Sequence, residues 1–183
     1  MGKELKILIV DDERELCEAL KGILVKGNKY EIDTSDSAED AIQKVEDEHF
    51  ALILCDYKLG GDKTGLDVLF RAKEKDPNVI TILMTGFGTD QLAVRAVAEG
   101  VYDYLVKPFK SILDVKNVVE RGMKYYILLR KYDEKLADEE SQKELLKETL
   151  EKAKRTREIL KMLVNKIGTH SCEDIEGGDA GGL

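Results

Sequence analysis

The chain has 183 residues, of which 43% are hydrophobic and 36% charged, and its formal net charge is −8. Its length suits one or two small domains, and its apolar runs are far shorter than the ~18 residues that a membrane-spanning helix needs. The negative charge argues against direct binding to nucleic acid, because such binding depends largely on lysine and arginine contacts with phosphates. We therefore expect a folded protein that inserts into no membrane and binds no nucleic acid directly.

The N-terminus and the spacing of the cysteines predict the compartment in which the protein acts. Residues 1–5 lack the apolar segment and the small-residue cleavage site of a secretory signal, so we expect a cytoplasmic protein. Cys17, Cys55 and Cys172 lie far apart, without the paired spacing of a disulfide framework or a zinc site. We expect these three thiols to be buried or incidental.

Short apolar segments rich in β-branched residues alternate with longer helical patterns from Lys6 to about Phe109. This alternation predicts βαβ units and an α/β fold with a parallel sheet. The expected strands are Lys6–Val10, Tyr30–Thr34, Ala51–Cys55, Val79–Met84 and Tyr102–Val106. The expected helices are roughly Glu13–Lys26, Ala38–Glu48, Leu66–Lys75, Asp90–Glu99 and the sequence after Ser111. Five strands and five helices predict a doubly wound sheet that is covered on both faces.

Polar side chains follow the ends of four predicted strands. They are Asp11 and Asp12 after the first strand, Asp56 after the third, Thr85 after the fourth and Lys107 after the fifth. Parallel strands end at the same edge of a sheet, where ligands bind in open α/β folds. If the first and third strands are neighbours, three carboxylates, one hydroxyl and one ammonium therefore meet in one crevice.

Such a crevice favours a divalent cation and phosphoryl chemistry. Clustered carboxylates repel one another, and a hard cation such as Mg²⁺ suits oxygen ligands where no histidine is near. A carboxylate beside this ion is placed to attack phosphorus. Lys107 and Thr85 would stabilise charge on the phosphoryl oxygens.

Four motifs occur in chain order at these strand ends. They are Val10-Asp11-Asp12-Glu13, Leu54-Cys55-Asp56, Met84-Thr85-Gly86 and Tyr104-Leu105-Val106-Lys107-Pro108-Phe109. Each is weakly specific alone, but together they resemble the signature of bacterial two-component response-regulator receiver domains, also called CheY-like domains. The resemblance spans residues 5 to about 125. It implies a flavodoxin-like sheet with strand order 2-1-3-4-5.

The same resemblance assigns the metal site and the phosphoacceptor. It implies that Asp56 is phosphorylated by a sensor histidine kinase with the help of Mg²⁺. Asp12, Asp56 and the backbone carbonyl of Lys58 would bind the ion directly. Asp11 would act mainly through a bound water.

The resemblance also implies a conformational switch. Lys107 would pair with Asp56 and later with the phosphoryl oxygens, and its peptide bond to Pro108 is expected to be cis. Thr85 and Tyr104 match the switch pair, in which the hydroxyl moves to the phosphate and the aromatic ring turns inward. This repacking would carry a local charge change to the face formed by the fourth helix, fifth strand and fifth helix.

The loop after Asp56 departs from the family pattern. Gly60 stands where the family usually has proline, and Gly65 comes one residue late. We expect this loop to be more mobile than usual, because glycine enlarges backbone freedom. Lys58 and Phe87 flank the expected phosphoryl site, and we expect them to slow its hydrolysis by obstructing water.

The C-terminal third of the chain continues in helix-compatible sequence to about Lys166. Mostly apolar residues recur there at alternating spacings of three and four, which predicts a coiled coil and a homodimer. These positions are Val115, Val118, Gly122, Tyr125, Leu129, Tyr132, Leu136, Glu139, Lys143, Leu146, Leu150, Ala153, Arg157, Leu160, Val164 and Ile167. Residues 1–125 would be the receiver domain, 126–168 the helical extension and 169–183 a disordered tail.

The extension leaves alternatives open. The polar positions Glu139 and Lys143 allow a bend or an antiparallel hairpin, and a single helix without self-association is a further reading. Ion pairs at i,i+4 are expected to support the helix. These pairs are Glu139/Lys143, Glu148/Lys152 and Glu151/Arg155.

The sequence therefore predicts a phosphoacceptor switch that controls dimerisation or partner binding, and not an enzyme that turns over a substrate. One alternative is a phosphatase of the haloacid dehalogenase class, which also uses an aspartyl phosphate and Mg²⁺. That class requires an Asp-x-Asp-x-Thr run after the first strand, and Asp11-Asp12-Glu13-Arg14 does not supply it. Another alternative is the receiver and linker of a larger regulator.

Overall fold

The computed structural model describes residues 5–25, 30–86, 96, 98 and 100–170, the last four of these by backbone alone. The chain divides into two compact units, Met1–Tyr132 and Asp133–Leu183. The first unit contains a parallel sheet in the order β2-β1-β3-β4-β5. Its strands are β1 (Leu5–Val10), β2 (Tyr30–Ser35), β3 (Leu52–Asp56), β4 (Ile80–Thr85) and β5 (Asp103–Val106). The predicted doubly wound fold and strand order are confirmed.

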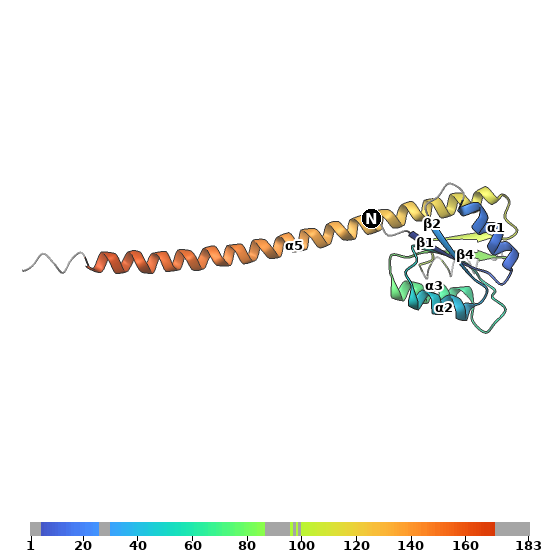
Figure 1. The fold of residues 1–183 in the computed structure, drawn as a ribbon, viewed down its shortest axis with the longest axis horizontal. Helices are drawn as coiled ribbons and strands as arrows, with labels where there is room; N and C mark the ends of the chain where they lie inside the picture. The colour runs from blue at the N-terminus through green and yellow to red at the C-terminus, as the bar shows by residue number, and fades with distance from the viewer. Residues whose placement is uncertain (1–4, 26–29, 87–95, 97, 99, 171–183) are drawn as a thin grey trace, which may run out of the picture. The chain divides into compact units, whose positions relative to one another are not determined.

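Helices cover both faces of this sheet. They are α1 (Arg14–Leu24), α2 (Ala38–Asp47), α3 (Gly65–Lys75) and α5 (Ile112–His170). The first turns of α5 share one hydrophobic core with α1, and α2 and α3 form a second core on the opposite face, as Figure 1 shows. The helix expected at Asp90–Glu99 lies largely outside the described residues, of which Ala96 and Ala98 are helical.

The central strands supply both cores at once. All five residues of β3 are buried, because successive side chains point to opposite faces and each face is covered. Leu52 and Leu54 lie in the core beside α1 and α5, and Ile53 and Cys55 lie in the core beside α2 and α3. This two-sided burial fixes the carboxyl end of β3 within the fold.

The first part of α5 packs closely on the sheet at Gly122. Val115, Val119 and Met123 are buried, and a Cβ atom at Gly122 would lie 2.9 Å from side-chain carbons of both Ile80 and Leu52. The predicted coiled coil is therefore wrong at its start. Val115 and Gly122 pack against the sheet there, so these two positions cannot meet a second helix.

The second unit consists of the rest of α5. The helix runs without interruption through Glu139 and Lys143, so the predicted bend or hairpin is not seen. All residues from 133 to 166 are exposed. The two compact units divide at Tyr132, and the domain boundary expected at residue 125 stays a prediction. Thr169 and His170 belong to α5, and the rest of the expected disordered tail, 171–183, lies outside the described residues.

The ion pairs on this unit follow a different spacing from the predicted one. They occur at i,i+3, between Glu144 and Lys147, Glu151 and Lys154, and Glu158 and Lys161. None of the three predicted i,i+4 pairs is among the salt bridges of the described residues. Both spacings place charges on neighbouring turns, so the sequence alone does not choose between them. No helix in the described part of the chain is long and apolar enough to span a membrane.

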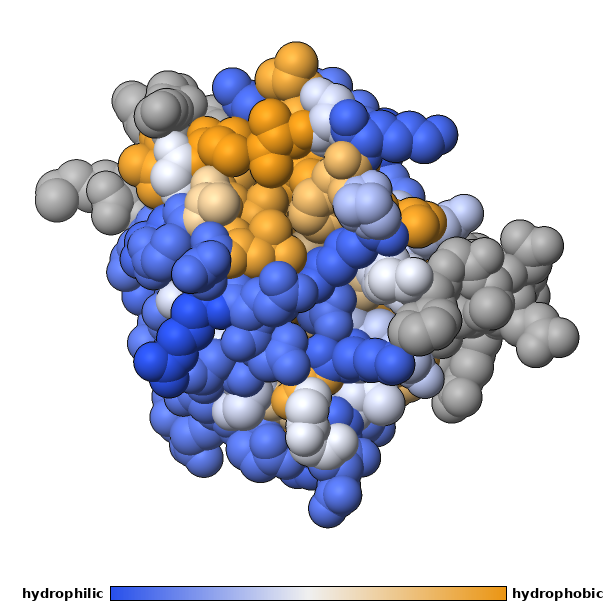
Figure 2. Space-filling view, turned by 90° about the vertical axis from the view of Figure 1, so that its right-hand side faces the viewer, coloured by the Kyte–Doolittle hydropathy of each residue, from blue (hydrophilic) through white to orange (hydrophobic). Residues whose placement is uncertain are grey.

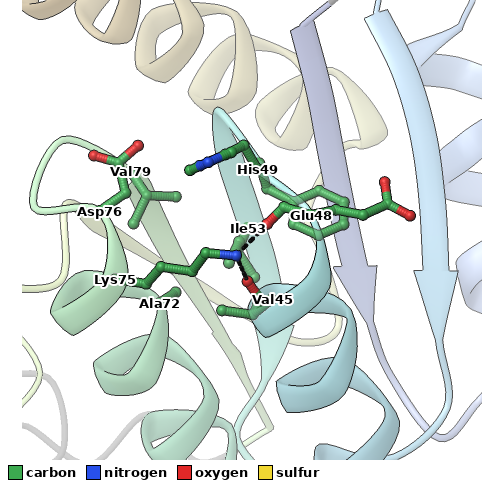
Figure 3. A pocket seen from close by; sticks show the side chains of 9 residues that line it. Val45, Glu48, His49, Ile53, Ala72, Lys75, Asp76 and Val79 are labelled. Carbon is green, nitrogen blue, oxygen red and sulfur yellow. Dashed lines mark hydrogen bonds between the residues drawn. The ribbon is translucent and has the colours of Figure 1, made fainter.

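Lys75 joins the C-terminal ends of α2 and α3. Its ammonium donates to the backbone oxygens of Val45 and Glu46 at 2.5 Å and of Glu48 at 3.0 Å. This lysine lines a hollow of about 10 Å³, which is room for about one water. Figure 3 shows the side chains around it. Val79, which precedes β4, lines the hollow. This feature therefore lies at the amino edge of the sheet and is too small for a ligand.

Gly122 offers a test of how closely α5 approaches the sheet. We expect Gly122→Leu to lower the free energy of unfolding by about 1–3 kcal/mol, because the added side chain overpacks the core. Gly22→Leu is the matched control, since Gly22 also lies in a helix but nothing lies within 4 Å of its Cβ position. Chemical denaturation should show no loss for the control. Equal losses at both sites would contradict the packing described.

Candidate functional site

Two carboxylates meet at the carboxyl edge of the sheet because their strands are neighbours. β1 and β3 pair in a register that places Val10 beside Cys55, so the next residues, Asp11 and Asp56, lie side by side. Asp56 is the last residue of β3. Lys107 enters from the end of β5, as predicted. The sheet thus brings together residues that are almost 100 positions apart in the chain.

The ammonium of Lys107 lies between the two carboxylates. Its Nζ atom is 2.5 Å from Oδ2 of Asp11 and 2.8 Å from Oδ1 of Asp56. Asp11 is fully buried, and the side chains of Asp56 and Lys107 are only 9% and 17% exposed. The Lys107-Pro108 peptide bond is cis, which confirms the prediction. A single cation therefore links the ends of β1, β3 and β5.

Backbone amides hold the remaining carboxylate oxygens. The amide of Lys58 donates to Oδ2 of Asp56 at 2.9 Å, and the amide of Glu13 donates to Oδ1 of Asp11 at 3.1 Å. Each carboxylate therefore has one oxygen bound to a backbone amide and the other bound to the ammonium. Hydrogen bonds of this kind orient a carboxylate before any ligand arrives.

Neighbouring strands fix the backbone around these groups. The amide of Tyr57, the residue after Asp56, donates to the carbonyl of Met84 at 2.8 Å. The amide of Lys107 donates to the carbonyl of Thr85 at 2.8 Å. A movement at the end of β4 would therefore also move the backbone at Asp56 and Lys107.

Burial and charge act against each other in this site. Burial raises the pKa of the Asp11 carboxyl, and the hydrogen bond from Lys107 offsets this only in part. Burial alone would lower the pKa of Lys107, but its hydrogen bonds with Asp11 and Asp56 outweigh burial and raise that pKa. Lys107 is therefore charged at neutral pH. One ammonium cannot fully neutralise two carboxylates, so the site attracts further positive charge.

The two thiols nearest the site are unsuited to metal binding. Burial raises the pKa of the Cys17 thiol to about 11 and that of Cys55 well above its ordinary value. Both are free, buried cysteines, which confirms the prediction for these two; Cys172 lies outside the described residues. A cysteine binds a metal only as a thiolate, and these two thiols keep their protons at neutral pH. The donors available here are therefore oxygens. Oxygen donors fit a hard divalent cation.

Asp12 is the third carboxylate of the predicted site, and it is exposed. Its Oδ2 atom lies 3.5 Å from the position that a Cβ atom would take on Gly60. Asp12 thus faces the loop that follows Asp56. Within the described part of the chain, no three acidic, histidine or cysteine side chains form a ready cluster for a metal. The ammonium of Lys107 lies between two of the predicted ligands instead.

Thr85 and Tyr104 occupy neighbouring strands, as predicted. Thr85 is the last residue of β4 and is 4% exposed, whereas Tyr104 in β5 is 41% exposed. In the register of the two strands, Thr85 pairs with Val106 and Leu83 pairs with Tyr104. The tyrosine ring therefore lies outward in this structure. Phe87, the other predicted neighbour of the site, lies outside the described residues.

Sequence reasoning missed the role of Gly65. A Cβ atom on this residue would lie 2.0 Å from the carbonyl oxygen of Asp56 and 3.0 Å from Sγ of Cys55. The amide of Gly65 also donates to the carbonyl of Tyr57 at 2.9 Å. The start of α3 thus lies against the backbone of Asp56, where only glycine fits. Its position at a helix start, where glycine is a poor helix former, was the available signal.

Gly60 shows why the loop differs from the family pattern. Its φ of 70° lies in the left-handed region, which glycine adopts readily and proline cannot, because the proline ring fixes φ near −65°. Glycine at this position therefore gives the loop a different backbone path. Increased mobility of the loop stays a prediction.

Comparisons with known proteins agree with this geometry. Residues 7–127 match the family described as response regulator receiver domain. The response regulator protein FleR of Pseudomonas aeruginosa is 38% identical over 112 residues, which are 60% of this chain and 23% of FleR. The chain spans about a quarter of the length of several such curated relatives.

Solved structures with the same fold are also similar in sequence. A CheY-like receiver domain protein from Methanospirillum hungatei JF-1 is 29% identical, with a TM-score of 0.62 over 68% of this chain and 97% of that one. The beryllofluoride-activated NtrC4 receiver domain dimer is 30% identical, with a TM-score of 0.61 over 66% of this chain and 98% of that one. The similarity covers the first unit of this chain.

Gly65 offers a test of the contact between the start of α3 and Asp56. We expect Gly65→Ala to lower the free energy of unfolding by about 1–3 kcal/mol, because its methyl group would overlap the backbone of Asp56. Gly61→Ala in the same loop is the control, since the nearest atom to its Cβ position is 3.9 Å away. Thermal or chemical denaturation of both variants checks this. A Gly65→Ala protein as stable as the control would contradict the contact.

Proposed function

Since this chain belongs to the response regulator receiver domain family, we propose that Asp56 accepts a phosphoryl group from a sensor histidine kinase. Receiver domains in general act as phosphoacceptor switches and not as classical enzymes. The observation that carries the assignment to Asp56 is its position at the end of β3, bound by the Lys107 ammonium and the Lys58 amide. Of the two buried carboxylates, Asp56 is the one with some solvent exposure.

The proposed reaction is a transfer between two side chains. A carboxylate oxygen of Asp56 attacks the phosphorus of a phosphohistidine, the new O–P bond forms as the P–N bond breaks, and the imidazole takes up a proton. The hydrogen bonds of Lys107 and Lys58 hold the nucleophile in place before the reaction. Lys107 then stabilises the phosphoryl oxygens with the charge that it now shares with Asp11 and Asp56.

We assign a Mg²⁺ ion to the same edge. Receiver domains generally bind Mg²⁺ at the phosphorylation site, and the oxygen donors here fit that ion. Asp11, Asp12, Asp56 and the backbone carbonyl of Lys58 would hold it, with Asp11 acting mainly through a water. When bound, the ion supplies positive charge against the phosphoryl oxygens. The incomplete neutralisation of two carboxylates by one ammonium supports this assignment.

The proposed switch connects Asp56 to the surface through β4 and β5. The hydroxyl of Thr85 would move to the phosphoryl group, and the outward ring of Tyr104 would turn into the space that it leaves. Among the exposed apolar side chains of the first unit are Val106, Ile112 and Leu113. Figure 2 shows a face on which apolar residues gather within a mostly hydrophilic surface. A surface of this composition suits a protein partner whose binding depends on the switch.

The output that we propose is dimerisation or partner binding through the helical extension. Some receiver domains dimerise, as the name of the NtrC4 structure states for that protein. We further propose that this chain acts in the cytoplasm and does not itself bind nucleic acid, which its net charge of −8 supports. Match to the receiver family weighs against the haloacid dehalogenase alternative. A larger regulator that contains this chain is compatible with the proposed switch.

Phosphorylation of Asp56 is tested by labelling the full chain with acetyl phosphate in the presence of Mg²⁺. We expect one phosphoryl group per chain and none in Asp56→Asn, because an amide is not a nucleophile of this kind. Asp47→Asn is the matched control, since Asp47 ends α2 and has no contact with the site. Undiminished labelling of Asp56→Asn would refute the assignment, and turnover of small phosphate esters would favour the phosphatase.

The metal assignment is tested by the Mg²⁺ dependence of the same labelling. We expect Asp12→Asn to raise the Mg²⁺ concentration for half-maximal labelling at least roughly tenfold, a loss typical even of residues that only support a metal ligand. Asp47→Asn should respond to Mg²⁺ as the unmodified chain does. If labelling of the unmodified chain needs no divalent ion, the metal assignment is incorrect.

A further inference from the structure

The second unit has an apolar stripe that no described residue of the chain covers. Leu136, Leu146, Leu150 and Leu160 are 42%, 69%, 54% and 56% exposed. Spacings of ten, four and ten residues place these leucines along one side of the helix, on a and d positions of a continuous heptad pattern. Residues 133–166 contain nearly five such heptads, which is enough for a stable coiled coil. The stripe therefore calls for a second helix.

Three charged residues interrupt this stripe, and they indicate how a second helix would pack against it. They are Glu139, Lys143 and Arg157, which occupy d, a and a positions. Salt bridges between described residues involve none of the three, although many of their neighbours are paired. Charges at core positions of a coiled coil are costly unless they meet an opposite charge. The residue that each charge faces on the second helix therefore decides between a parallel and an antiparallel dimer.

A parallel dimer in register places each core residue against its own copy. Glu139 would face Glu139, Lys143 would face Lys143 and Arg157 would face Arg157. Three layers of like charge would then lie within five heptads. Like charges that are brought together and desolvated in this way cost several kcal/mol. This arrangement is disfavoured.

An antiparallel dimer has a register in which none of these three charges faces a like charge. Leu136 then faces Leu160 of the second copy, and Leu146 faces Leu150. Glu139 faces Arg157, an opposite charge. Lys143 faces Ala153, whose small side chain leaves room for the lysine stem to carry its ammonium to water. Each of these layers occurs twice because the two copies are related by a two-fold axis.

Four of the five charged e positions beside the core fit the same register; the fifth, Lys147, would face its own copy, and it pairs with Glu144 of its own helix instead. Antiparallel helices bring e positions together, so Asp133 would lie near Lys161 of the second copy and Glu140 near Lys154. Lys154 and Lys161 also lie near Glu151 and Glu158 of their own helix, at 2.8 and 3.1 Å. The flanking charges would thus form mixed networks of both signs, with acids toward one end of the unit and lysines toward the other.

Neighbouring antiparallel registers lose this match. A shift of one heptad in one direction places Glu139 against Leu150 and Lys143 against Leu146. The opposite shift places Glu139 against Val164 and Lys143 against Leu160. Either shift buries charges against apolar side chains and breaks the pairing of leucines. Of these three registers, only the first pairs both the opposite charges and the leucines.

We propose that residues 133–166 of two copies of this chain pair as an antiparallel coiled coil, with Glu139 of each copy facing Arg157 of the other. The inference deepens the proposed function and rests on its output through dimerisation. It is independent of phosphorylation, which the labelling of Asp56 tests separately. The occupant of the apolar stripe is thus a second copy of the same chain.

A charge exchange in the full chain distinguishes the two arrangements. In the antiparallel dimer, Glu139→Arg sets arginine against Arg157 and should raise the dimer Kd at least roughly tenfold. Adding Arg157→Glu should restore the unmodified Kd, because glutamate again faces arginine. In a parallel dimer the double variant would still have like charges in both layers. Glu148→Arg is the control, since Glu148 lies on the outer f position and should leave the Kd unchanged.

Disulfide cross-linking provides the second readout, with Cys172→Ser as background so that only the new thiols react readily. Leu136→Cys chains mixed with Leu160→Cys chains should form a disulfide between the two kinds of chain, and neither alone should dimerise covalently. Rapid cross-linking of Leu136→Cys alone would establish a parallel dimer and overturn the proposal, while leaving dimerisation intact. A chain that is monomeric by light scattering, with and without beryllofluoride, would overturn both the coiled coil and the proposed output.

Discussion

The buried ammonium of Lys107 between two carboxylates is the constraint on which the rest of the site depends. Asp11 follows β1, Asp56 ends β3 and Lys107 follows β5, so the ion pairs at 2.5 and 2.8 Å form only when these strands take their places in one sheet. Removing the cation would leave two carboxylates together in a site where burial already raises the pKa of Asp11. Charge pairing of this kind commits the strand ends to a single geometry.

In the proposed function, the same pairing would make the site respond to a phosphoryl group on Asp56. A phosphoryl group brings a charge of about −1.5 to −2 near pH 7. Lys107 would then have to pair with the phosphoryl oxygens as well as with the carboxylates of Asp11 and Asp56. The backbone amide of Lys107 donates a hydrogen bond to the carbonyl of Thr85, and that of Tyr57 donates one to the carbonyl of Met84. A change in the charges around Asp56 therefore acts on the end of β4 and the start of the segment after β5. In the proposed switch, these backbone hydrogen bonds would be the physical link between Asp56 and the surface at β5 and α5.

Much of this arrangement follows from sequence pattern, because it depends on local periodicity and on the geometry of parallel strands. The continuously apolar β3 and the residues that end it could be predicted from the pattern. The meeting of Asp11, Asp56 and Lys107 needed, in addition, the strand order that the family resemblance implies. The contact of Gly65 with Asp56 could not, since close approach of a helix to a strand end leaves no periodic signal. The start of the heptad pattern was misleading for a related reason. Val115 and Gly122 satisfy both a coiled-coil spacing and the spacing of a helix on a sheet, and only the tertiary fold decides between them.

The central claim is that Asp56, and no other carboxylate, becomes phosphorylated. Borohydride reduces an aspartyl phosphate to homoserine, so reduction of the phosphorylated full chain followed by peptide mass spectrometry identifies the modified position. The account predicts homoserine at position 56 alone, in the peptide that contains the end of β3. Homoserine at position 11 or 12, or its absence from a chain that has been fully labelled, would contradict it.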